Sequence, residues 1–295
     1  MCVDFSADEI RNRLGISTLA INFLPNERLD SHHIENFSRN GICSLELFGG
    51  FDPNDQKHLK QIRSEADNFG IKIVSIHGPG GKFSSAYPDG ITEDERKQAL
   101  EAAKIKGEAA LVLGAGILVC HFGTTYTSAC SVLDLIDHFK GTPLILGGEN
   151  VGKAVSSLKD SDSVADFVEF TKKIDSQQFK MVLDIGHARD LSGRNPFFAD
   201  GSAYETTCIC RDCLVHGHLH DGFTKHLDHH YPPFDGEVRW VEIFKAFREI
   251  NYQGCYMFEP VYENYSPSHQ NENVIEKVGS FPENFMAEYR KQSNT

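Results

Sequence analysis

Eight short apolar runs, separated by segments of helical composition, constrain the fold of this chain more than any other feature. The runs begin at Leu14, Ile42, Ile71, Gly116, Pro143, Lys180, Leu214 and Gly254, and successive starts lie 27 to 45 residues apart. The intervening stretches 54–69, 92–113 and 238–250 are rich in helix-forming residues. Regular alternation of strand and helix is typical of a parallel sheet built from βα units. Eight units in about 250 residues predict an α/β fold of the (β/α)8 TIM-barrel type. The competing doubly wound open sheet usually has about five or six strands.

The chain of 295 residues shows no linker, low-complexity tract or break in composition. We therefore expect a single domain over 1–295, with the barrel over about 14–262. A polar tail over 263–295 follows, and the segment 282–292 predicts a helix within it.

Charge and cysteine usage narrow the classes of function. The formal net charge is −13, and no basic run interrupts it, which disfavours binding to nucleic acid or to an anionic membrane. No apolar run approaches the roughly 20 residues of a membrane span, and the N-terminus lacks the pattern of a signal peptide. Several of the eight cysteines lie inside apolar runs, as buried free thiols do. We expect a cytoplasmic protein that does not contact membranes.

Six consecutive predicted strands, the third to the eighth, carry a carboxylate or an imidazole at or near their carboxyl ends. These residues are His77, His121, Glu149, Asp184, His218 and Glu259. Active sites of a TIM barrel form at this face. Because several converging charged groups are costly to bury without a counter-ion, and because these are ligand types of zinc or manganese, the pattern predicts a divalent metal site.

Two local motifs add candidates. Asp184 and His187 form a D-x-x-H turn at the end of the sixth strand, so both side chains can face one centre. Asp228 and His230 form a D-x-H on the loop after the seventh strand. Glu46 ends the second strand at the barrel mouth, where it is either a substrate contact or a structural partner of a lysine.

Eight motifs, in this order, resemble the xylose isomerase-like TIM-barrel superfamily, which includes sugar phosphate isomerases and epimerases and endonuclease IV. They are SLELFGG, VSIHGP, LVCHFG, GGENV, LDIGH, VHGHLHDG, DHH followed by FDGE, and MFEP. The resemblance to the epimerase branch implies that one divalent metal binds Glu149, Asp184, His218 and Glu259, and that His187 contacts the substrate. Lys225 is the basic residue nearest to the position of the arginine that many epimerases carry on the seventh loop.

The endonuclease IV branch implies a different metal content, because its nine ligand positions for three zinc ions are all filled here. These positions add His77, His121, His187, Asp228 and His230 to the four residues above. The cofactor is therefore expected to be one to three ions of manganese or zinc.

The leading interpretation is a metal-dependent isomerase or epimerase, with a related lyase activity also open, acting on a small sugar-like molecule. Glu149 and Glu259 would exchange a proton at a carbon next to a carbonyl. Substrate contacts would come from His187, Glu46 and Lys225. The alternative is an endonuclease IV-like multinuclear zinc phosphodiesterase. A catalytically inactive barrel used in assembly is a third class, which the intact ligand series disfavours.

Overall fold

The computed structural model places the eight predicted strands in one closed parallel barrel, in the order β1 to β8. It describes residues 5–21, 23–24, 26–79, 92–151, 163–188, 194–199, 201–223, 230–261 and 271–293. The strands are β1 (Leu14–Ser17), β2 (Ser44–Leu47), β3 (Lys72–His77), β4 (Ile117–His121), β5 (Ile145–Glu149), β6 (Phe179–Asp184), β7 (Leu214–Leu219) and β8 (Tyr256–Phe258). Seven of them lie within a predicted apolar run, and β6 begins one residue before its run. The (β/α)8 prediction is confirmed, and the open-sheet alternative is wrong because β8 pairs with β1.

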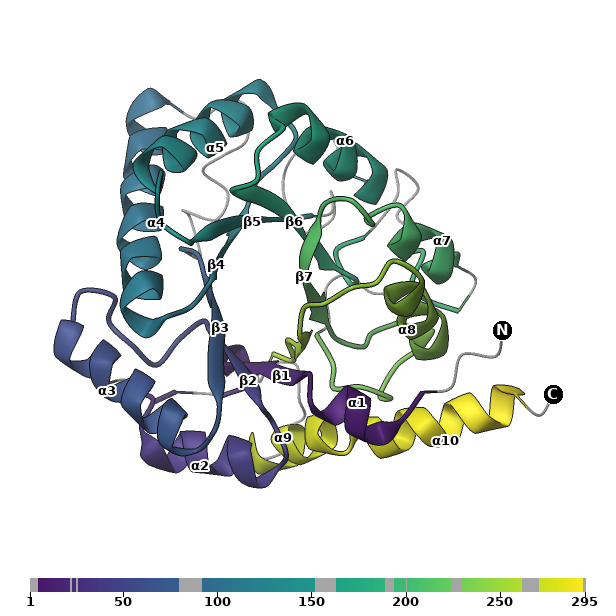
Figure 1. The fold of residues 1–295 in the computed structure, drawn as a ribbon. Helices are drawn as coiled ribbons and strands as arrows, with labels where there is room; N and C mark the ends of the chain where they lie inside the picture. The colour runs from purple at the N-terminus through teal and green to yellow at the C-terminus, as the bar shows by residue number, and fades with distance from the viewer. Residues whose placement is uncertain are drawn as a thin grey trace.

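The helices form a ring outside the strands (Figure 1). They are α1 (Ala7–Arg11), α2 (Ser31–Arg39), α3 (Gln56–Asn68), α4 (Glu93–Leu113), α5 (Tyr126–His138), α6 (Val164–Ile174), α7 (Ala203–Cys208), α8 (Trp240–Glu249), α9 (Asn271–Gly279) and α10 (Phe281–Ser293), with a 3-10 turn, η1, over Thr18–Ala20. The longest, α4, starts at a capping box between Thr92 and Glu95 and ends at Gly114, whose φ of 76° suits a residue without a side chain. None of the described helices is both long and apolar enough to cross a membrane.

The C-terminal helices pack against the barrel rather than extending from it. In Figure 1, α10 runs beside α1, where the two ends of the chain lie. Phe5 contacts Phe285 and Tyr289 with edge-on rings, at centroid distances of 5.2 and 5.1 Å. Phe281 packs on Trp240 of α8 and on Phe258 of β8. These aromatic contacts hold α10 against α8, β8 and the N-terminal segment.

Strand register decides which side chains meet inside the barrel. His121 pairs with Glu149 across β4 and β5, and Asp184 pairs with His218 across β6 and β7. Gly147, two residues before Glu149, lacks a side chain where a Cβ would lie 2.7 Å from Val182 Cγ2 and 3.0 Å from Ile117 Cγ2. Glycine at this position therefore leaves room for the side chains of Val182 and Ile117 just below the polar layer.

Candidate metal centre

Four consecutive strands, β5 to β8, bring one carboxylate or imidazole each to a common point. Glu149 and Asp184 end β5 and β6, His218 lies near the end of β7, and Glu259 directly follows β8. One ligand atom from each of these four side chains lies within 4.8 Å of the others, and all four residues are buried. The structure thus brings together the four residues that the resemblance to the epimerase branch assigns to a metal.

Glu149 lies at the centre of the arrangement, with imidazoles around both of its oxygens. Its Oε2 atom is 3.0 Å from His121 Nε2, 3.4 Å from His77 Nε2 and 3.4 Å from His218 Nδ1. Its Oε1 atom is 3.0 Å from His187 Nδ1. The strand-end histidines of β3 and β4 therefore join the same cluster as the four residues of β5 to β8.

Several of these buried atoms make no hydrogen bond of acceptable geometry within the part of the chain that the structure describes. They include both oxygens of Glu149, His121 Nε2 and His218 Nδ1. Buried polar atoms without such partners are costly. Ligand atoms around a tetrahedral zinc ion, each at 2.0 to 2.2 Å from the metal, stand about 3.3 Å apart. Because Oε2 of Glu149 lies 3.0 to 3.4 Å from its imidazole neighbours, the residues fit a divalent cation.

The environment drives the pKa values of the two glutamates apart. Burial raises the pKa of Glu149, but the charges of His121 and His218 and the close contacts with His121 and His187 outweigh burial and hold this pKa well below the usual range. Burial raises the pKa of Glu259 to about 8, and attraction to His218 and His230 only partly opposes this effect. In the metal-free protein at neutral pH, one glutamate is ionised and the other holds a proton. Divergent environments of this kind assign acid and base roles in enzyme sites.

Asp184 is held by contacts that the sequence analysis did not identify. Its Oδ1 atom accepts hydrogen bonds from the backbone N–H groups of Gly186 and His187, at 2.8 and 2.7 Å, and lies 3.1 Å from His220 Nε2. Asn150 Nδ2 donates to the Asp184 carbonyl, and the Asp184 N–H donates to Asn150 Oδ1. His220 directly follows β7 and continues the alternation of His216 and His218 in the sequence, which is the signal that could have revealed it.

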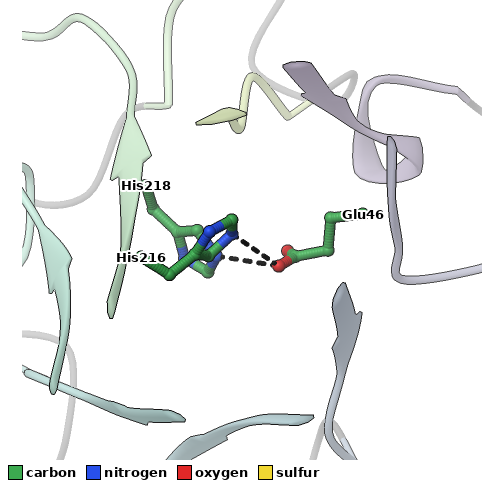
Figure 2. Close-up of side chains that lie close together, drawn as sticks. All are labelled: Glu46, His216 and His218. Carbon is green, nitrogen blue, oxygen red and sulfur yellow. Dashed lines mark hydrogen bonds and ion pairs between the residues drawn. The ribbon is translucent and has the colours of Figure 1, made fainter. Parts of the chain in front are cut away.

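Of the other residues predicted from the sequence, His230 and Glu46 lie next to the candidate metal centre. His230 stacks on His220, with ring centroids 3.8 Å apart, and its Nδ1 lies 2.7 Å from the Glu259 carbonyl. Asp228 and Lys225 lie outside the described residues. Glu46 is fully buried, and its carboxylate contacts His218 Nε2 (Figure 2). Glu149 contacts the other ring nitrogen of His218, Nδ1.

Comparisons with known proteins agree with this architecture. A family model described as a xylose isomerase-like TIM barrel matches residues 34–283. The uncharacterized protein MJ1311 of Methanocaldococcus jannaschii is 24% identical over 265 residues, which cover 84% of this chain and 83% of the relative. Similar solved structures include an L-ribulose 3-epimerase (TM-score 0.71, 16% identity, covering 96% of this chain and 97% of the other). A D-tagatose 3-epimerase-like protein gives a TM-score of 0.69 at 19% identity, covering 96% and 98% of the two chains. The 3-keto-D-glucoside 4-epimerase YcjR of E. coli also gives 0.69, at 16% identity and 92% and 99% coverage.

Proposed function

The chain belongs to the xylose isomerase-like TIM-barrel family, and from that premise we propose that it is a divalent-metal-dependent isomerase or epimerase of a small sugar-like substrate. The observation that carries the proposal is the meeting of Glu149, Asp184, His218 and Glu259 within 4.8 Å at the carboxyl ends of four adjacent strands. The epimerase names of the similar structures support the reaction class. Manganese and zinc are the ions that suit these ligand types. A cytoplasmic location stays a prediction.

The two glutamates supply the acid and base of the proposed reaction. A divalent cation held by the four residues would polarise the substrate carbonyl and an adjacent hydroxyl, which lowers the pKa of the neighbouring C–H. Glu149, whose carboxylate stays ionised, accepts the proton from that carbon at one of its oxygens. Glu259, whose carboxyl holds a proton near neutral pH in the metal-free protein, returns a proton to the substrate. For an epimerase, the return on the opposite face inverts the carbon.

Substrate binding is proposed for the residues around this pair. His187 lies 3.0 Å from Glu149, so its imidazole can hold a substrate oxygen close to the base. His121 has the only side chain of the Glu149 cluster, among the described residues, that is appreciably exposed, at 21%. The substrate therefore approaches the buried carboxylates past β4. Lys225 remains a proposed contact on the seventh loop.

Exchange of a carbon-bound proton with solvent tests the reaction class. The manganese- or zinc-loaded protein is incubated with a panel of keto-sugars in deuterated water, and deuterium at the carbon next to the carbonyl is followed by NMR. Glu149→Gln keeps the size of the side chain and an oxygen that can bind the metal, but it removes the proposed base, so exchange should fall by about 100-fold or more while metal occupancy falls less. Glu101→Gln, an exposed site on α4, is the matched control and should exchange normally.

A second function is favoured by the contacts of His77 and His121 with Glu149. Both imidazoles lie within 3.4 Å of the same carboxylate oxygen, so His77, His121 and Glu149 would hold an additional cation, which would activate water in an endonuclease IV-like zinc phosphodiesterase. The net charge of −13 opposes binding to a polyanion. Abasic-site DNA is therefore incubated in parallel with the keto-sugars. Incision of the DNA without exchange in any sugar would replace the leading proposal by this one.

A further inference from the structure

A second buried cluster lies inside the barrel next to the candidate metal centre. Glu46 of β2 reaches His216 and His218 of β7, as Figure 2 shows, and Ser75 of β3 completes the group. All four residues are 5% exposed or less, and the Glu46 and His218 side chains are fully buried. Ser75 Oγ donates a hydrogen bond of 2.7 Å to Glu46 Oε2, while His218 Nε2 and His216 Nε2 lie 3.1 and 3.4 Å from the same oxygen.

The two nitrogens of His218 face different partners. Nδ1 lies 3.3 Å from Glu259, 3.4 Å from Glu149 and 3.9 Å from Asp184, so it points into the candidate metal centre. Nε2 points to Glu46, in the opposite direction around the ring. A neutral imidazole can bind a cation through Nδ1 only when the proton resides on Nε2. That proton then needs an acceptor inside the barrel, and Glu46 Oε2 is positioned to accept it.

The surroundings of Glu46 keep its side chain an acceptor. Ser75 Oγ donates to its Oε2 atom, and the Nε2 atoms of His218 and His216 lie within 3.4 Å of the same oxygen. All of these groups are buried, so Oε2 is the acceptor on which they converge. Carboxylate acceptors of this kind fix the ring of a metal-binding histidine and increase the basicity of its other nitrogen.

We propose that Glu46 is a positioning residue, which fixes His218 in the Nε2-protonated tautomer and turns its Nδ1 toward the cation. This role replaces the substrate contact expected from the sequence, and it rests on the metal-dependent function proposed above. Ser75 and His216 contact the same oxygen of Glu46, Oε2, and help to hold the carboxylate in place. The same three side chains, Glu46, His216 and His218, are also close enough to hold a cation themselves. Ser75 already occupies the shared oxygen, which favours the hydrogen-bonded arrangement, and the experiment below separates the two.

Metal affinity, measured by competition with a chelator for Zn2+ and for Mn2+, tests the proposal on the full-length protein. Glu46→Ala should bind the metal about 10- to 100-fold more weakly than the unaltered protein, the usual effect of losing such an outer partner. Glu46→Gln, whose amide oxygen still accepts the Nε2–H bond, should recover much of that loss. Leu59→Ala, a fully buried change on α3, should lower the melting temperature but leave affinity unchanged.

The tautomer gives a readout that a loss of packing alone would not change. In 15N–1H spectra that resolve the histidine rings, the metal-loaded protein should show His218 protonated at Nε2, and Glu46→Ala should lose that protected proton. If Glu46→Ala does not fold, Glu46→Asp replaces it in the test. The shorter side chain keeps the buried carboxylate but moves it away from His218 by the length of one methylene, so metal affinity must fall in this variant.

Three results would overturn the proposal in distinguishable ways. An unaltered affinity in a folded Glu46→Ala or Glu46→Asp protein removes the positioning role while the metal site stands. Loss of one whole equivalent of metal, with the rest bound as tightly as before, makes Glu46 a ligand instead. If the unaltered protein binds neither ion, the proposed metal-dependent function fails, and the role of Glu46 fails with it.

Discussion

Metal binding to this protein should become tighter as the pH rises from 6 to 8, because the cation displaces a proton that Glu259 and His218 hold between them. Glu259 Oε2 lies 3.3 Å from His218 Nδ1, and both atoms face the candidate centre. Burial raises the pKa of Glu259 to about 8. Burial lowers the pKa of His218, but the charges of Glu259, Glu46 and Glu149 outweigh that effect and raise it well above the usual range. The pair therefore keeps at least one proton at neutral pH.

The size of the effect follows from the pKa of Glu259. A group of pKa about 8 is deprotonated in about 1% of molecules at pH 6, about 9% at pH 7 and about 50% at pH 8. Because a ligand must lose its proton before it binds, the apparent affinity should rise about 50-fold between pH 6 and pH 8. A proton displaced from His218 as well would make the rise steeper, and the gain should level off above about pH 9.

Isothermal titration calorimetry in two buffers of different ionisation enthalpy measures the affinity for the metal and the number of protons released on binding. At pH 7 we expect about one proton or more to be released for each ion bound. Glu259→Gln has no carboxyl proton to lose, so the number of protons released per bound ion should fall by about one. Glu101→Gln on the surface of α4 should behave like the unaltered protein. An affinity that stays constant from pH 6 to 8, with no difference between buffers, would refute the reasoning.

Three further predictions concern stability, stoichiometry and support of the ligands. In the metal-free protein, Glu259 binds its proton more tightly when folded (pKa about 8) than when unfolded (about 4.5), so protonated Glu259 adds to the free energy of unfolding. This contribution should be lost as the pH rises through about 8, which lowers the melting temperature. Added metal should restore the melting temperature. His121→Ala should remove about one equivalent of zinc if His121 holds an additional ion, whereas unchanged stoichiometry by metal analysis would point to a substrate role. Gly186→Ala should weaken metal binding about 10-fold or more, because its Cβ would come within 1.9 Å of the His220 ring that supports the Asp184 ligand; an affinity equal to that of the unaltered protein would contradict this.

The sequence alone predicted the barrel and the residues that meet in it, because both depend on short-range patterns. Side chains along a strand alternate between two faces, so each apolar run shows which residues point into the barrel. Alternation of strands and helices places the carboxyl ends of all strands at one face of the barrel. Glu149, Asp184 and His218 could therefore be chosen from single strands, before their partners across the barrel were known. The recurring motifs around them were sufficient to identify the family, which the match over residues 34–283 confirms.

Contacts between distant strands could not be predicted in this way. Glu46 and His218 are 172 residues apart, and only the closure and stagger of the barrel bring β2 and β7 together across its interior. The sequence placed Glu46 at the mouth, where it faced substrate or a lysine; the fold buries it beside an imidazole instead. The opposed pKa values of Glu149 and Glu259 are likewise set by three-dimensional surroundings, since both are strand-end glutamates in sequence. Local periodicity thus determined which side chains point inward, while strand register and burial decided which of them touch and which hold a proton.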